Sequence, residues 1–141
     1  MQPVPQTSIG QLAGALTNFP PVDIATLHNL SGHVYARTMF IPAGCCLVGA
    51  THKTDHINIV LGDITVTTAS GPMRVTGYRL LPAQAGHKRA GYAHADTVWT
   101  TICSTTKSSL EEIENELVVE SADLLTRQPS LHQINSILLG S

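Results

Sequence analysis

Three histidines carry the most direct chemistry in this sequence. His52 and His56 lie in the segment 49–63, GATHKTDHINIVLGD, and His87 follows downstream. Neutral imidazoles bind transition metals, and three protein ligands leave a coordination position open for water or substrate. The sequence therefore predicts a three-histidine site for a divalent metal: zinc, iron, nickel or manganese. The alternative is that the same imidazoles line a polar pocket and hydrogen-bond to Thr54, Asn58 or water.

A second polar cluster follows His87 directly, in the segment 88–94, KRAGYAH. It brings two cations, a phenol and an imidazole close together, and guanidinium and ammonium groups bind phosphates and carboxylates. The alternative is a solvated loop at the rim of the fold. The residues that we predict to bind a small anionic ligand are Asn58, Arg37, Lys88, Arg89, Tyr92 and His94.

Arg37 and the cysteines need a separate interpretation. Arg37 lies in an otherwise apolar segment, so if it is buried it needs an acidic partner, for which Asp55, Asp63 and Asp96 are candidates. Cys103 is either a thiol with a histidine partner or, as is commoner for a free cysteine, a small buried hydrophobe. Tyr35 and Trp99 are expected to pack in the core or an interface.

The segment that holds His52 and His56 is typical of a β-strand. The β-branched run 57–61 is followed by Gly62 and Asp63, which predicts a strand that ends in a turn. Alternate side chains of a strand point to the same face. If the pleat begins at position 52, one face carries His52, Thr54, His56, Asn58 and Val60.

The surrounding chain also favours β-structure. From His33 to Cys103 it consists of short β-rich runs separated by turn signals such as Pro42-Ala43-Gly44 and Ser70-Gly71-Pro72. Several short strands without helical periodicity between them predict a sandwich or a barrel. We therefore expect a mainly β fold with a single antiparallel β-barrel.

Helical patterns flank this zone. Capping boxes at Ser8, Ser108 and Ser130 precede apolar stripes with helical spacing. The predicted organisation is an N-terminal arm with a short helix (1–26), the barrel (27–104) and an extension with two short helices (105–141). These helices either cover open edges of the barrel or exchange with a neighbouring subunit.

Composition limits the function classes. Of 141 residues, 43% are apolar and 13% are charged, with a net charge of −2, which indicates a globular protein. There is no basic footprint for nucleic acid, no apolar run that spans a membrane and no visible signal peptide. Three cysteines, two of them adjacent, favour a reducing compartment, so we expect a cytoplasmic protein.

Two motifs resemble those of the cupins, which are small jelly-roll barrels that often hold a metal. The first contains Pro42-Ala43-Gly44, His52, His56 and Gly62, and the second is the segment 81–87, LPAQAGH. His52 takes the second histidine position of the first motif, Ala50 stands at the first, and His56 replaces the usual glutamate. His87 matches the histidine of the second motif. The runs HKTDHINIVLGDITV and KRAGYAHADTVWTTI are also similar to short single-domain cupin-like proteins, many of them encoded by bacteriophages.

Three functions follow as hypotheses. The first is a metal-binding cupin, with the isomerase, lyase or dioxygenase activity that the resemblance implies. The second is a non-catalytic binder of a small anionic ligand. The third is a structural homo-oligomer of a virion or of the host cytoplasm, in which the barrel is a scaffold.

Overall fold

The computed structural model describes residues 24–119, and these form a curled β-sheet and one helix. The elements are β1 (Ala25–Ser31), β2 (Val34–Ile41), β3 (Cys46–Val48), β4 (His56–Thr68), β5 (Gly71–Ala83), β6 (Ala90–Ala93), β7 (Thr97–Ser104) and α2 (Leu110–Leu117). The helices predicted near Ser8 and Ser130 lie outside the described residues.

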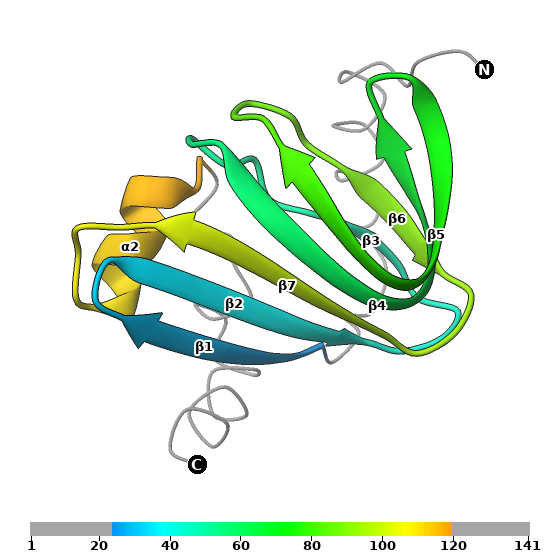
Figure 1. Cartoon of the computed structure of the whole chain (residues 1–141), viewed down its shortest axis with the longest axis horizontal. Coiled ribbons are helices and arrows are strands. Elements are labelled where there is room, and N and C mark those ends of the chain that lie inside the picture. Colours follow the sequence, from blue (N-terminus) through cyan, green and yellow to red (C-terminus); the bar gives the residue numbers. More distant parts are fainter. Residues whose placement is uncertain (1–23, 120–141) are drawn as a thin grey trace, which may run out of the picture.

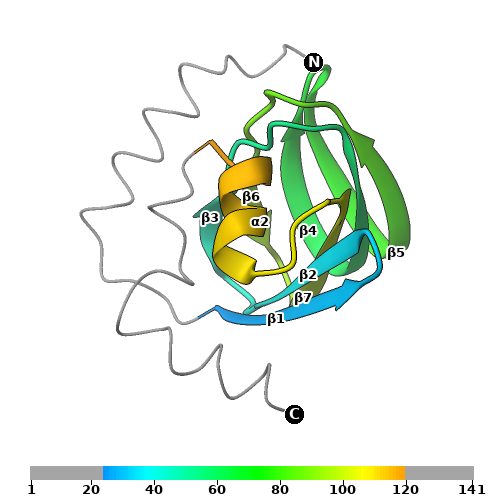
Figure 2. The ribbon, with the colours of Figure 1, turned by 90° about the vertical axis from the view of Figure 1, so that its left-hand side faces the viewer.

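All strand pairs are antiparallel, and the long β4–β5 hairpin joins two parts of the sheet. The first half of β4 pairs with β7, which continues to β2 and β1, and the second half pairs with β6, which continues to β3. The hairpin curls so that β3 and β6 lie behind β4 and β5 (Figure 1). Figure 2 looks into the curl, with α2 lying across its open end. The prediction of a mainly β, antiparallel fold is thus confirmed, and the sheet forms a half-barrel.

Gly62 is the residue at which β4 changes partners. Pairing with β7 ends at Leu61, and pairing with β6 begins at Ile64. Gly62 has φ +149°, and a Cβ there would lie within 2.9 Å of backbone atoms of Asp96 and Thr97. Only glycine fits this close approach. The predicted turn at Gly62-Asp63 is therefore wrong, because the glycine permits a bend in a continuous strand.

Two strands were not predicted from the sequence. β1 precedes the first expected strand, and its inward residues Thr26 and His28 are buried but polar, so it has no apolar alternation. β6 has only four residues and lies within the segment 88–94, for which the sequence suggested a ligand-binding cluster or a loop. β1 could not be recognised because its buried residues are polar, and β6 could not be recognised because it is short.

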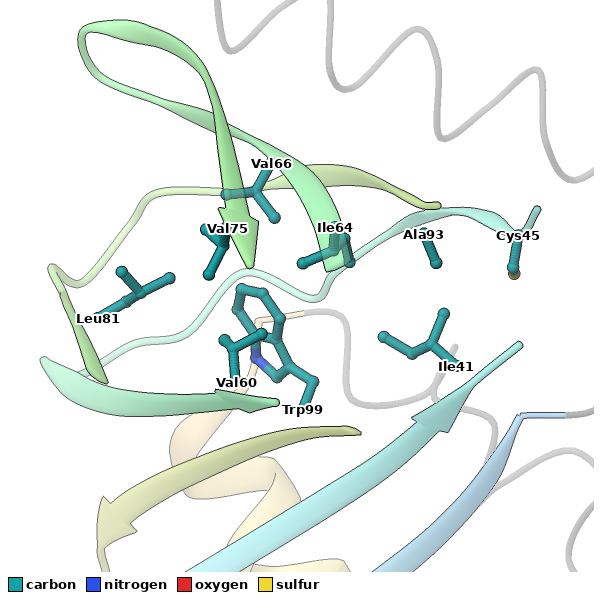
Figure 3. Packing of buried hydrophobic residues seen from close by; sticks show 9 residues of the cluster. All are labelled: Ile41, Cys45, Val60, Ile64, Val66, Val75, Leu81, Ala93 and Trp99. Carbon is teal, nitrogen blue, oxygen red and sulfur yellow. The ribbon is translucent and has the colours of Figure 1, made fainter. Parts of the chain in front are cut away.

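The main core fills the curl and is built by alternation along β4. Val60, Ile64 and Val66 are buried, and they meet Val75 of β5 and Trp99 of β7 (Figure 3). Each such aliphatic side chain stabilises the fold by about 1.5–3 kcal/mol relative to full exposure. The prediction that Trp99 packs in the core is confirmed.

Helix α2 closes a second, smaller core. Its buried residues Ile113 and Leu117 pack with Tyr35 of β2 and Cys103 of β7. Cys103 is therefore a buried hydrophobe, and Tyr35 is a core residue, as predicted.

The N-terminal cap of α2 is shifted from its predicted position. The Oγ of Ser109 accepts a hydrogen bond from the amide of Glu112 at 3.2 Å, whereas the sequence predicted a cap at Ser108 paired with Glu111. Since both serines are followed by a glutamate at the third position, the pattern alone did not distinguish them.

Candidate functional site

A cavity of about 770 Å³ lies between the β4–β5 hairpin and the segment that connects β5 to β6. The tip of the hairpin contributes Thr67 and Thr68, and β7 contributes Cys103. Ser104 of β7 is also polar, and the remaining polar lining comes from the start of β4 and the connecting segment: Asp55, His56, Gln84, His87, Lys88 and Arg89. This volume is typical of a small-molecule site.

Arg89 is the most informative residue of the cavity. Its Nη1 is buried and has no hydrogen-bond partner among the described residues. Burial lowers the pKa of Arg89 from its ordinary value, yet a guanidinium remains charged in proteins. Its backbone is fixed, because the carbonyl of Arg89 accepts a hydrogen bond from the amide of Gly49 at 2.8 Å. Arg89 also lines the cavity, so an anion bound there would meet its guanidinium group.

The other charged groups of the cavity include both signs. Lys88 adds a second cation beside Arg89, and Asp55 adds a carboxylate. The Oδ1 of Asp55 already accepts a hydrogen bond from the amide of Ala85 at 2.8 Å, which ties the connecting segment to the start of β4. The carboxylate thus holds the wall of the cavity in place, and Lys88 and Arg89 add positive charge to the lining.

The structure brings His52 and His56 together, but not on one strand. Their ring centroids are 4.1 Å apart with an interplanar angle of 34°. β4 begins only at His56, while His52 forms an isolated bridge to Val118 at the end of α2, so the predicted pleat from position 52 is wrong. Nδ1 of His56 lies 3.0 Å from the carbonyl oxygen of Thr54, which favours the tautomer with its lone pair on Nε2.

The donor set does not fit a three-ligand metal centre. Within residues 24–119, no group of three or more His, Cys, Asp or Glu side chains is arranged to hold a metal ion. His56 and His87 both line the cavity, and His52 lines a separate small space beneath α2. We therefore derive no chemistry from a metal at these histidines.

Asn58 and Arg37 belong to a polar row inside the sheet. His28, Arg37, Thr101 and Asn58 are neighbours in register across β1, β2, β7 and β4. The Oδ1 of Asn58 accepts hydrogen bonds from Thr101 Oγ1 at 3.0 Å and from the indole nitrogen of Trp99 at 3.2 Å. Asn58 is therefore a structural crosslink between β4 and β7.

Arg37 and His28 each retain an unsatisfied buried nitrogen. Arg37 Nε and His28 Nε2 have no hydrogen-bond partner among the described residues. Arg37 lines a space of only about 10 Å³ with Glu114 and Tyr35, which is room for about one water molecule. The aspartates considered as partners of Arg37 bond elsewhere: Asp55 to Ala85, Asp63 to Arg74 and Asp96 to Ala43.

His28 was not singled out in the sequence. Its Nδ1 lies 2.6 Å from the hydroxyl of Tyr35, and the two rings stack. Burial, helped by the charge of Arg37, lowers the pKa of His28 from 6.5 to about 4. Burial raises the pKa of Tyr35 well above its ordinary value. The alternation of Thr26 and His28 was the available signal, but it is too short and too polar to indicate an inward face.

Tyr92 and His94 lie away from the cavity, near the outer end of β6. Both are exposed, their rings meet edge to face at 5.1 Å, and Nε2 of His94 lies 2.7 Å from Thr65 Oγ1. Neither residue lines the cavity. The structure therefore separates the predicted cluster at 88–94 into two cavity residues, Lys88 and Arg89, and two surface residues.

Comparison with known proteins shows the fold. No protein-family model and no curated protein matches the sequence. A cupin-superfamily protein from Desulfitobacterium hafniense matches with a TM-score of 0.51 and 12% identity, over 63% of this chain and 85% of that one. A Rhizobium leguminosarum protein of unknown function matches with a TM-score of 0.50 and 15% identity, over 74% and 97% of the two chains.

An enzyme is also among the structural neighbours. Salicylate 1,2-dioxygenase from Pseudoaminobacter salicylatoxidans, described with gentisate adducts, matches with a TM-score of 0.52 and 7% identity, over 68% of this chain and 30% of that one. At such identities the likeness establishes a cupin-like fold. The bacteriophage origin suggested by the sequence stays a prediction. No helix within residues 24–119 is long and apolar enough to cross a membrane.

Proposed function

We propose that this cupin-like chain binds a small anionic ligand in the cavity between its long hairpin and the β5–β6 connection. The observation that carries the proposal is the adjacent pair of cations, Lys88 and Arg89, in the lining of a cavity of about 770 Å³. The Nη1 of Arg89 is buried and has no hydrogen-bond partner among residues 24–119. Leaving a buried charged donor unsatisfied is costly, whereas a charge-assisted hydrogen bond to a carboxylate or phosphate is strong.

The lining suggests how the ligand would be held. Arg89 binds the anionic group and Lys88 adds charge, while Thr67, His56 and His87 offer further hydrogen-bonding groups. Ile57 and Pro82 give the cavity an apolar wall against which the uncharged part of the ligand packs. The occupant is therefore a small organic anion with an apolar portion. The three free cysteines, Cys45, Cys46 and Cys103, support the proposal that it acts in a reducing compartment such as the cytoplasm.

The first experiment identifies the occupant and tests Arg89. Purified protein is denatured, and the released small molecules are analysed by mass spectrometry. Separately, binding of benzoate and of inorganic phosphate is measured by calorimetry for the wild type, Arg89→Gln and the control Arg79→Gln. Arg79 is exposed and does not line the cavity. Because one charge-assisted hydrogen bond contributes about 1.5–3 kcal/mol, we expect at least about tenfold weaker binding in Arg89→Gln alone.

Equal affinities in the two arginine variants would contradict the proposal. Metal analysis of the same preparations distinguishes the competing hypothesis. The metal hypothesis predicts one tightly bound metal per chain, which is lost in a His52→Ala/His87→Ala variant. That result would mean that the site binds a metal and not an anion.

A further inference from the structure

The outer face of the half-barrel carries no charge over a large area. In the central row of side chains, β1, β2, β7, β4 and β5 contribute neighbours in register, namely Leu27, Thr38, Thr100, Ile59 and Leu80. The rows on either side continue this pattern with Phe40, Val98, Leu61 and Tyr78, and with Ala36, Ile102, Ile57 and Pro82. We call these three rows the apolar outer face. β1, β2, β7 and β4 lie side by side in Figure 1.

Large side chains of this face are exposed. The exposed fractions are 54% for Leu61, 53% for Leu80 and 63% for Tyr78. Single exposed apolar residues are ordinary, but contiguous patches of several hundred Å² mark interaction sites. Thr38 and Thr100 bond to each other, with their Oγ1 atoms 2.8 Å apart, so one of the two hydroxyl protons at the centre is satisfied within the sheet. The apolar outer face is thus suited to burial.

The dimensions of the face match the core of a protein interface. Five strands spaced by about 4.8 Å and three rows spaced by about 6.7 Å give a footprint of about 500 Å². A standard interface buries about 800 Å² per partner, with an apolar core and a polar rim. A charged rim begins at one border of the face. Asp63 follows Leu61 on the same face of β4, and it forms an ion pair (2.7 Å) with Arg74, which lies beyond Thr76 from Tyr78 on β5.

We propose that the apolar outer face docks a second copy of this chain, face to face, as a two-fold dimer. A two-fold axis places the same patch on both partners, so any charge near the axis would meet its own like charge. A face without charges avoids this repulsion, whereas an interface with an acidic or basic partner would need complementary charges. Ile57, Pro82 and Ile102 also line the cavity, so the second copy would border it.

The test uses the full-length chain and opposite charges at two positions. Leu61 and Leu80 point outward and do not line the cavity. We expect the wild type to be a dimer in sedimentation equilibrium. Leu61→Glu/Leu80→Glu and Leu61→Lys/Leu80→Lys should each dimerise at least about 100-fold more weakly, because like charges then meet at the interface. An equimolar mixture of the two variants should recover dimers. Leu30→Lys, a change at an exposed leucine on the opposite face, should dimerise like the wild type.

Other outcomes would overturn the proposal. A monomeric wild type would mean that the face is covered by the chain itself or by another partner. Undiminished dimers of both charged variants would place the interface elsewhere, and a mixture that stays monomeric would exclude face-to-face contact. If the double variants do not fold, a second experiment replaces Tyr78 by a photo-crosslinking phenylalanine analogue and tests for a covalent dimer. Absence of a covalent dimer at concentrations where the wild type dimerises would then count against the proposal.

Discussion

The buried imidazole of His28 makes a quantitative prediction about stability and pH. It is neutral in the folded protein, lies against Tyr35 and is opposite Arg37 in register. Its pKa is about 4 in the folded state and 6.5 when it is exposed to water. Between these two values the unfolded chain binds a proton that the folded chain does not. The contribution of His28 to the free energy of unfolding is therefore complete above pH 6.5 and is lost as the pH falls toward 4.

The size of this effect follows from the two pKa values. At about 1.4 kcal/mol per pH unit, the interval from 6.5 to about 4 corresponds to about 3 kcal/mol. Carboxylates also titrate at acidic pH, so the effect of His28 is measured as the difference in the free energy of unfolding between the wild type and His28→Gln. His28→Gln cannot be protonated, and its amide can still bond to the hydroxyl of Tyr35. We expect it to be less stable than the wild type at pH 7, with the gap closing by about 3 kcal/mol at pH 4.

Urea unfolding at intervals between pH 4 and 7.5 measures this gap. His33→Gln is the control, because it makes the same substitution at an exposed histidine. It should follow the wild type at every pH. If the His28→Gln and wild-type curves stayed parallel throughout, the imidazole would not be a buried neutral group, and the reasoning would fail.

Two further predictions concern backbone positions. Gly62→Ala should lower the free energy of unfolding by about 3 kcal/mol or more, because the new Cβ meets backbone atoms of Thr97. Gly77→Ala is the control, since φ is +70° but the space is open, and it should cost about 1 kcal/mol in the same urea titrations. Ser109→Ala should destabilise the protein by about 1 kcal/mol through loss of the α2 cap, whereas Ser108→Ala should have little effect in thermal unfolding. Equal destabilisation by the two glycine variants would contradict the close contact at Gly62. Equal destabilisation by the two serine variants would contradict the cap at Ser109.

The fold class could be predicted because the inward side chains of several strands are apolar and alternate. Ile64 and Val66 of β4 and Trp99 of β7 show this pattern directly in the sequence. β1 could not be predicted, since the residues that it buries are polar and His28 meets Tyr35 only after β1 has paired with β2. The bend at Gly62 depends on a contact with Thr97, far away in sequence, so the local signal was indistinguishable from a turn.

The candidate site was predicted in part. Lys88 and Arg89 follow His87 directly, and all three line one cavity with His56. His52 could not be placed, because its position depends on a bridge to Val118 after α2 rather than on the strand that follows it. Tyr92 lies within β6 and does not line the cavity, and that strand was too short to recognise. Residue types indicated the chemistry, but long-range pairing decided which of them meet.

The position of β7 constrains the order of assembly. It is the last strand of residues 24–119 in chain order, yet it pairs with both β2 and β4. The β4–β5 hairpin closes locally, whereas β2 reaches β7 only after some sixty intervening residues have been brought together. Non-local pairing of this kind slows folding to milliseconds or longer. During synthesis, the unpaired edges of β2 and β4 therefore stay open until Ser104 has left the ribosome, and this is the interval in which a nascent chain would most benefit from a chaperone.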